Sequence, residues 1–327
     1  MAVVRGVGHV SVDSNTSNGT GQGGETVLVL VTGSSGLVGS ALTARLEDGG
    51  HSVRRLRRGA SVTSDPSTTS WNPEDGTLAD GALDGVDAVV HLAGENIAGG
   101  RWTAQRKAAI RVSRVEGTRR LSEALANSAS PPRVLVCASA IGFYGDRGDQ
   151  RLDESAVPGT GFLPDVCLEW EAAVAPAREA GIRVVNLRIG VVLTADGGAL
   201  AKMLTPFKLG VGGIIGAGQQ YMSWIALDDL LGVVLHILDD DEMSGPVNAV
   251  TPEAVTNHVF TKTLGHVLGR PTVFPMPAFA ARLVFGEMAD ALLLASSRVV
   301  PMRLTERGFE CVHPELEGAL RHVLRRG

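Results

Sequence analysis

Between residues 27 and 195, apolar runs typical of strands alternate with segments in which apolar residues recur every three or four positions, as in helices. Residues 27–31 form a continuous apolar run, typical of a strand buried on both faces. Apolar positions then recur at helical spacing over 37–47. The same patterns predict strands at 51–56, 87–93, 133–139 and 182–193, and helices at 103–125 and 165–180. Pro176 should bend or end the last helix early. This alternation predicts an α/β fold with a doubly wound parallel sheet.

The alternation fades after about residue 195, where glycine clusters such as "LGVGGIIGAGQQ" appear. We therefore expect a Rossmann-like domain over 27–194, with some exchange of strand and helix, and a smaller substrate lobe over 195–327. Residues 1–26 are rich in Gly, Ser, Asn and Thr and lack the apolar centre of a signal peptide, which predicts a disordered tail.

Charge and cysteine content narrow the class of protein. The formal net charge is −5, which argues against nucleic acid or an anionic membrane as the main partner. No uncharged apolar run is long enough to span a bilayer. Three widely spaced cysteines, Cys137, Cys167 and Cys311, suit neither a disulfide framework nor a zinc site. We expect reduced thiols, a cytoplasmic location and no metal site.

The stretch "VLVLVTGSSGLVGSAL" at 27–42 places Gly33, Gly36 and Gly39 between the first strand and the first helix. In a dinucleotide-binding turn the first glycine permits the tight turn, the second admits a pyrophosphate, and the third lets helix pack on strand. The helix N-terminus then faces the phosphates. A glycine-rich turn within a core is the alternative interpretation.

The end of the second strand indicates which dinucleotide binds. NAD sites usually carry an acidic residue there for the ribose 2′-hydroxyl. This chain has Arg57 and Arg58 instead, and guanidinium groups match a phosphate. The sequence thus predicts NADP, unless the two arginines are merely a solvated basic edge.

Further motifs point to a family. The glycine turn, "DAVVHLAG" and "ASAIGFYGD" together resemble the extended short-chain dehydrogenases of the NAD-dependent epimerase/dehydratase group. "HLAGENI", "WEAAV", "GGIIGAGQQYMSWI" and the terminal "RVVPMRLTERGFECVHPELEGAL" resemble one atypical branch, labelled epimerase family protein or cell-division-inhibitor-like. The resemblance covers nearly all of 27–324 and implies NADP as cofactor, with substrates largely undefined.

The resemblance also implies positions for the cofactor contacts and for a partner. The implied contacts are Gly33, Ser34, Ser35, Gly36, Leu37, Val38, Arg57, Arg58, Leu92, Ala93, Arg114, Gly190 and Val191. Related folds dimerise through the helices that correspond here to 103–125 and 165–180, so a homodimer is a further expectation. Small residues on these helices (Ala108, Ala124, Ala172 and Ala173) suit close contact, although alanine is also simply a good helix former.

The superfamily's catalytic tyrosine, with a lysine four residues later that lowers its pKa, is missing. Tyr144 and Tyr221 have no lysine at that spacing, and Leu163 and Cys167 stand where the pair would fall. Our catalytic candidates are Ser139 and Tyr144. Ser139 could instead bond only to backbone, with Ala140 in the serine's place, and Tyr144 could be a packed tyrosine.

For the substrate side we single out Glu95 and Asn96, which follow the third clear strand at the sheet edge where ligands bind. Met222 stands where epimerases carry an arginine that grips a sugar nucleotide's diphosphate. Met222 and Trp224 indicate either an apolar pocket or core. Glu171 has two interpretations, a catalytic residue or the partner of an arginine.

Together these residues predict an NADP(H)-dependent oxidoreductase that acts on a small carbonyl or enone substrate without the Tyr/Lys pair. A non-catalytic NADP(H) sensor is the alternative. A nucleotide-sugar epimerase is disfavoured by Met222.

Overall fold

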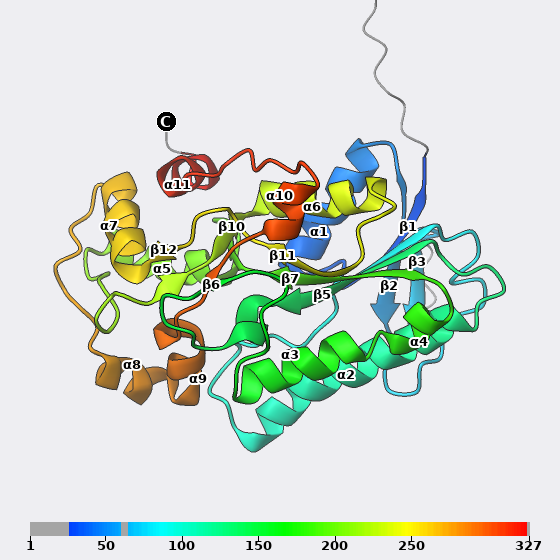
Figure 1. Cartoon of the computed structure of the whole chain (residues 1–327), viewed down its shortest axis with the longest axis horizontal. Coiled ribbons are helices and arrows are strands. Elements are labelled where there is room, and N and C mark those ends of the chain that lie inside the picture. Colours follow the sequence, from blue (N-terminus) through cyan, green and yellow to red (C-terminus); the bar gives the residue numbers. More distant parts are fainter. Residues whose placement is uncertain (1–25, 60–64, 326–327) are drawn as a thin grey trace, which may run out of the picture.

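The computed structural model describes residues 26–59 and 65–325, so almost all of the predicted tail lies outside the described residues. Its centre is a seven-stranded sheet in the order β11-β7-β5-β4-β1-β2-β3 (Figure 1). Every neighbouring pair is parallel, which confirms the predicted fold class. The strands are β1 (Leu28–Thr32), β2 (Ser52–Arg58), β3 (Thr68–Trp71), β4 (Ala88–His91), β5 (Val134–Ala140), β7 (Arg183–Ile189) and β11 (Gly245–Ala249).

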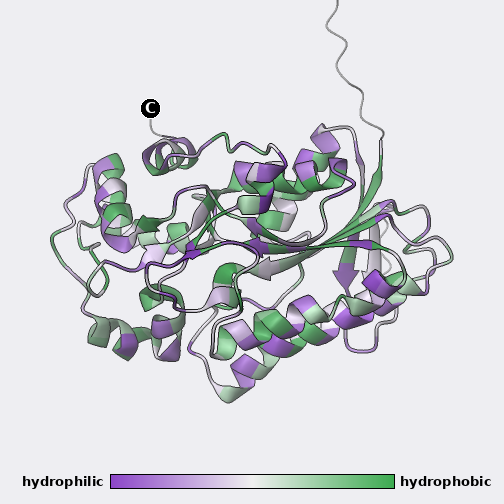
Figure 2. Ribbon diagram, in the orientation of Figure 1, coloured by the Kyte–Doolittle hydropathy of each residue, from purple (hydrophilic) through white to green (hydrophobic). Residues whose placement is uncertain are grey.

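Helices cover both faces of this sheet, as Figure 1 shows. One face carries α1 (Leu37–Asp48), α6 (Leu227–Asp239) and α10 (Met302–Glu306), and the other carries α2 (Ala104–Ala126), α3 (Phe162–Ala172) and α4 (Ala175–Glu179). Hydrophobic residues colour the inner strands and the sheet-facing sides of the helices (Figure 2). Burial on both faces explains the continuous apolar run of β1, in which Val29, Leu30 and Val31 are fully buried.

Two predicted elements are broken by identifiable residues. The predicted strand 182–193 is divided at Gly190 into β7 and β8 (Val191–Leu193). A Cβ at Gly190 would lie 2.7 Å from Val250 Cγ1, so only glycine fits this bend. The predicted helix 165–180 is two helices, with Pro176 in the first turn of α4, where proline is tolerated.

A second lobe has three small sheets that pair β8 with β10 (Trp224–Ala226), β9 (Tyr221–Met222) with β12 (Val255–Thr256), and β6 (Arg151–Leu152) with β13 (Arg298–Val299). Its helical elements are α5 (Gly198–Lys208), α7 (Asn257–Leu268), α8 (Ala278–Phe285), α9 (Glu287–Ala289), η2 (Asp290–Leu294) and α11 (Leu316–Val323), while η1 (Ile141–Tyr144) follows β5. Although α6 and β11 lie beyond residue 195, both return to the large sheet. Within the described residues, no helix combines the length and hydropathy needed to cross a bilayer.

Candidate functional site

The turn between β1 and α1 requires glycine at two of its three positions. Gly33 has a φ of +67°, and a Cβ there would lie 2.8 Å from the backbone of Leu92. A Cβ at Gly39 would lie 2.2 Å from the carbonyl oxygen of Gly33, so α1 could not pack against the turn. These contacts match the roles expected of the first and third glycines in a dinucleotide-binding turn.

The second glycine opens the helix N-terminus. Gly36 has a φ of −77°, and no side chain caps the helix that begins at Leu37. The Ser34 Oγ is buried and has no hydrogen-bond partner among the described residues. Uncapped N–H groups, a positive helix end and an orphaned hydroxyl together fit an anionic ligand such as a pyrophosphate.

Arg57 and Arg58 end β2 at the same sheet edge. Leu56 pairs with Thr32, so the two arginines lie level with the start of the glycine turn. Both are exposed, and no hydrogen bond or ion pair joins either guanidinium group to a described residue. By contrast, Arg54 bonds to the Asp84 carbonyl and Arg55 pairs with Glu47 at 2.6 Å. The two arginines predicted to bind a phosphate are therefore the two on this strand whose guanidinium groups are available.

Arg114 extends from α2 toward the segment after β4. Its Nη1 donates to the Glu95 carbonyl at 3.0 Å, and its guanidinium lies 5.1 Å from the centre of the Trp170 ring. Burial lowers the pKa of Arg114. Leu92 and Ala93 donate their N–H groups to Thr32 Oγ1, at the sheet edge of the glycine turn.

Gly190, between β7 and β8, and Val191, the first residue of β8, are half-buried, and their N–H groups donate to the backbone carbonyls of Ala249 and Ser223. Their roles as cofactor contacts, like those of the other implied residues, stay predictions.

The structure gives Tyr144 a packing role. Its side chain is fully buried, and its hydroxyl accepts from Arg188 Nη1 at 2.8 Å. The single proton of this hydroxyl is donated toward two acceptors, Asn248 Oδ1 at 2.7 Å and the Asp153 carbonyl at 3.0 Å. Burial raises the pKa of Tyr144 to about 12. Since this hydroxyl reaches neither solvent nor an open site, the geometry corrects its assignment as a catalytic candidate.

Ser139 belongs to a buried polar network that the sequence did not predict as a whole. Its hydroxyl donates to Glu171 Oε1 at 2.7 Å, so it does not bond only to backbone. Glu171 is held by Arg188 in a bidentate pair at 2.7 and 2.8 Å. The interpretation of Glu171 as an arginine's partner is therefore the one that the geometry supports. Arg188, buried in β7, had no sequence signal because its partners lie on other elements.

The positions that replace the Tyr/Lys pair carry no proton donor. Leu163 and Cys167 are both buried. Burial raises the pKa of the Cys167 thiol to about 12, so it stays protonated and packs as a small apolar side chain.

The four predicted substrate-pocket residues separate into two groups. Glu95 pairs with Arg106 at 3.0 Å, and Asn96 is exposed with its side-chain oxygen accepting from the Ala98 N–H. Trp224 is fully buried in the core of the second lobe, and Met222 packs against the same core. For Trp224 the pocket assignment is thus corrected to core.

The comparisons with known proteins agree with this architecture. The family model described as "NAD dependent epimerase/dehydratase family" matches residues 29–249. The chain belongs to this family. A second model, for a domain of unknown function named DUF1731, matches 276–323. An epimerase family protein of Mycobacterium bovis is 43% identical over 91% of this chain and 98% of its own length.

Solved structures extend the comparison. The human epimerase family protein SDR39U1 (isoform 2), crystallised with NADPH, matches with a TM-score of 0.83 and 35% identity, over 91% of this chain and 99% of its own. A protein from Corynebacterium glutamicum titled a nucleoside-diphosphate sugar epimerase matches with a TM-score of 0.76 and 38% identity, over 92% of this chain and 58% of its own. This family membership and fold confirm the resemblance seen in the motifs.

Proposed function

We propose that this protein is an NADP(H)-dependent oxidoreductase that reduces or oxidises a small carbonyl or enone compound. The observation that carries the proposal is the pair of available arginines, Arg57 and Arg58, level with a glycine turn whose Ser34 hydroxyl lacks a partner. The NADPH in the human relative supports the same choice of cofactor.

The described residues fit such a cofactor. The turn at Gly33 to Val38 would hold the pyrophosphate, and Arg57 and Arg58 would bind the 2′-phosphate. Bound NADP(H) supplies the hydride chemistry, while the protein supplies position and electrostatics.

Ser139 is the residue that we place beside the reacting carbonyl. Ser139 is 3% exposed and its proton points to Glu171, so any further hydrogen bond, such as one from an ordered water molecule, must be accepted by its oxygen. In the reductive direction the carbonyl carbon would accept a hydride from bound NADPH, and this water would give a proton to the carbonyl oxygen. The hydroxide left behind would take a proton from solvent. Tyr144 supplies no proton, because its hydroxyl is enclosed.

The test is NADPH oxidation by the purified protein with a panel of aldehydes, ketones and enones. Ser139→Ala should lower kcat while NADPH affinity is unchanged. Tyr144→Phe should cost stability but leave the kcat of the folded protein unchanged, because it removes only a buried hydroxyl. A loss of kcat in Tyr144→Phe alone would overturn this assignment.

One observation favours a second candidate, an NADP(H)-binding sensor without turnover. The two hydroxyls that the sequence predicted for catalysis, on Ser139 and Tyr144, already donate to side chains or backbone of the protein. NADPH binding without hydride transfer to any compound of the panel would favour the sensor. Competition of a UDP-sugar with substrate would instead favour an epimerase, which Met222 disfavours because it cannot bind a diphosphate.

A further inference from the structure

Asp228 on α6 lies close to two metal-ligating side chains from much later in the chain, His313 and His322. The ligand atoms of Asp228, His313 and His322 all lie within 4.8 Å of one another. His322 Nε2 is 2.6 Å from Asp228 Oδ2, and the rings of His313 and His322 stack with centres 4.0 Å apart. Among residues 26–59 and 65–325, this is the group of at least three His, Cys, Asp or Glu side chains that lie close enough to hold one metal ion.

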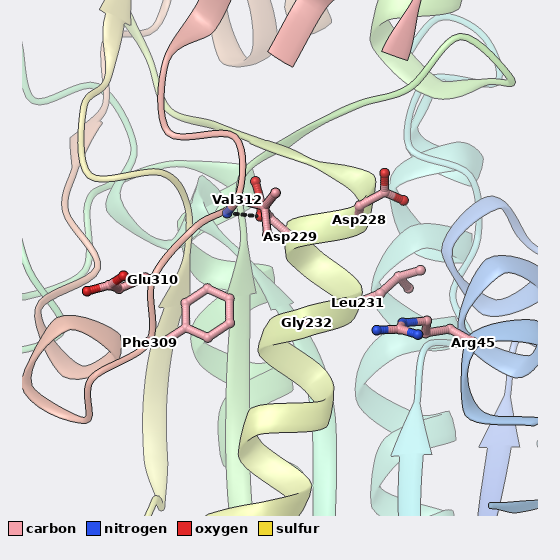
Figure 3. A pocket seen from close by; sticks show the side chains of 8 residues that line it. All are labelled: Arg45, Asp228, Asp229, Leu231, Gly232, Phe309, Glu310 and Val312. Carbon is pink, nitrogen blue, oxygen red and sulfur yellow. Dashed lines mark hydrogen bonds between the residues drawn. The ribbon is translucent and has the colours of Figure 1, made fainter. Parts of the chain in front are cut away.

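Two of the three residues lie on helices, and the third, His313, lies in the loop between α10 and α11. Asp228 lies in the first turn of α6, and His322 lies in the last turn of α11. The neighbouring Asp229, which is buried, accepts from the Val312 N–H at 2.6 Å and from the His313 N–H at 3.1 Å. Figure 3 shows Asp229 and Val312 joined in this way beside Asp228. The backbone of His313 is thereby fixed relative to α6.

A cavity of about 300 Å³ adjoins the cluster and shares Asp228 with it (Figure 3). Phe309 and Leu231 contribute apolar walls, and Arg45 reaches it from α1. An ion bound by Asp228 would therefore have the cavity on one side. This resembles metal sites that have three protein ligands and one free position.

We propose that Asp228, His313 and His322 bind a divalent ion of the zinc class. Two imidazoles and one carboxylate suit zinc and its neighbours, whereas magnesium and calcium prefer sets of oxygen ligands. Zinc binds nitrogen and oxygen ligands at about 2.0–2.2 Å, so tetrahedral coordination places the ligand atoms roughly 3.3 Å apart. The side chains of His322 and Asp228 are 45% and 59% exposed, so both have room to rotate toward that spacing.

The site departs from the expectation of no metal, and its position explains why sequence spacing missed it. His322 and Asp228 are 94 residues apart, so no local motif joins them. Both histidines lie within the segment matched by DUF1731, while Asp228 lies on a helix that covers the large sheet. The ion would therefore fasten this C-terminal segment to the nucleotide-binding domain.

The experiment uses the full chain without a histidine tag, stripped with a chelator. Zn²⁺ is added to the wild type and to the His313→Gln and His322→Gln variants, with His266→Gln as the matched control. His266 is a surface histidine that also faces a carboxylate, Glu317 at 3.7 Å, outside the cluster. Bound zinc per chain and the thermal midpoint are measured, with Mg²⁺ in parallel.

We expect one zinc per chain and a raised midpoint for the wild type and the control, and no shift with Mg²⁺. Each cluster variant should lose affinity by on the order of tenfold or more, since changes at outer-shell partners already cost that much. Co²⁺ should give the intense visible absorption of a four-coordinate site in the wild type and in the His266→Gln control, but not in the two cluster variants. Equal zinc binding by all variants, or none by the wild type, would overturn the proposal.

Discussion

The Thr32 Oγ1 lies 2.7 Å from His91 Nδ1, directly beneath the glycine turn. The same oxygen accepts from the N–H groups of Leu92 and Ala93 at 3.1 and 3.2 Å, so its own proton points to Nδ1. His91 Nε2, 3.0 Å from Thr118 Oγ1, must then carry the ring proton. The network fixes a neutral histidine between the turn and α2.

This arrangement predicts acid sensitivity. Burial lowers the pKa of His91 from 6.5 to about 4. The unfolded chain therefore binds a proton at higher pH than the folded chain does, and stability is lost as pH falls from about 6.5 toward about 4. We expect this residue to account for up to about 3 kcal/mol of that loss, measured by urea unfolding across the window. His91→Gln should flatten the pH dependence and His266→Gln should not; equal slopes in wild type and His91→Gln would contradict the assignment.

Replacing Arg57 and Arg58 together by Ala should weaken NADPH binding far more than NADH binding. Charge-assisted hydrogen bonds to a phosphate contribute about 1.5–3 kcal/mol, so a loss of roughly 10- to 100-fold is expected. Fluorescence titration with both nucleotides measures it. Arg178→Ala is the matched control, because Arg178 is an exposed arginine on α4. Equal loss for both nucleotides would mean that these arginines do not read the 2′-phosphate.

Local features of this fold could be predicted from the sequence, whereas contacts between distant elements could not. The glycine turn and Arg57 and Arg58 were found because strand, turn and helix are contiguous, and their meaning depends on short spacing. The network of Glu171 and Arg188 joins α3 to β7, and no periodicity records such a pairing. Trp224 was left open between pocket and core because an apolar residue reads the same in either place.

The glycine turn offers a comparison of two small substitutions. Gly39→Ala should destabilise the protein, because the new Cβ would lie 2.2 Å from a rigid backbone oxygen. Gly36→Ala meets only one atom, at 3.2 Å, and its φ of −77° suits alanine. We expect Gly36→Ala to keep its fold but bind NADPH at least roughly tenfold less well, because the methyl group occupies space for the pyrophosphate. Thermal unfolding and NADPH titration of both variants separate the two effects. Unchanged NADPH affinity in a folded Gly36→Ala variant would show that the phosphates lie elsewhere.

The ion pair of Glu171 and Arg188 predicts a strong energetic coupling. Their side chains are only 11% and 4% exposed, so removal of either partner leaves an uncompensated charge. Arg188→Met and Glu171→Leu should each lower the free energy of unfolding by about 3–5 kcal/mol. The double variant should lose much less than the sum, because no buried charge then remains. Arg282→Met is the matched control: its pair with Asp290 is more than half exposed, and its loss should cost less than about 1 kcal/mol. Urea unfolding of the wild type, the two single variants, the double variant and the control measures the coupling. Additive losses would show that the two charges act independently. Their pairing would then not be what holds Glu171 in place for Ser139.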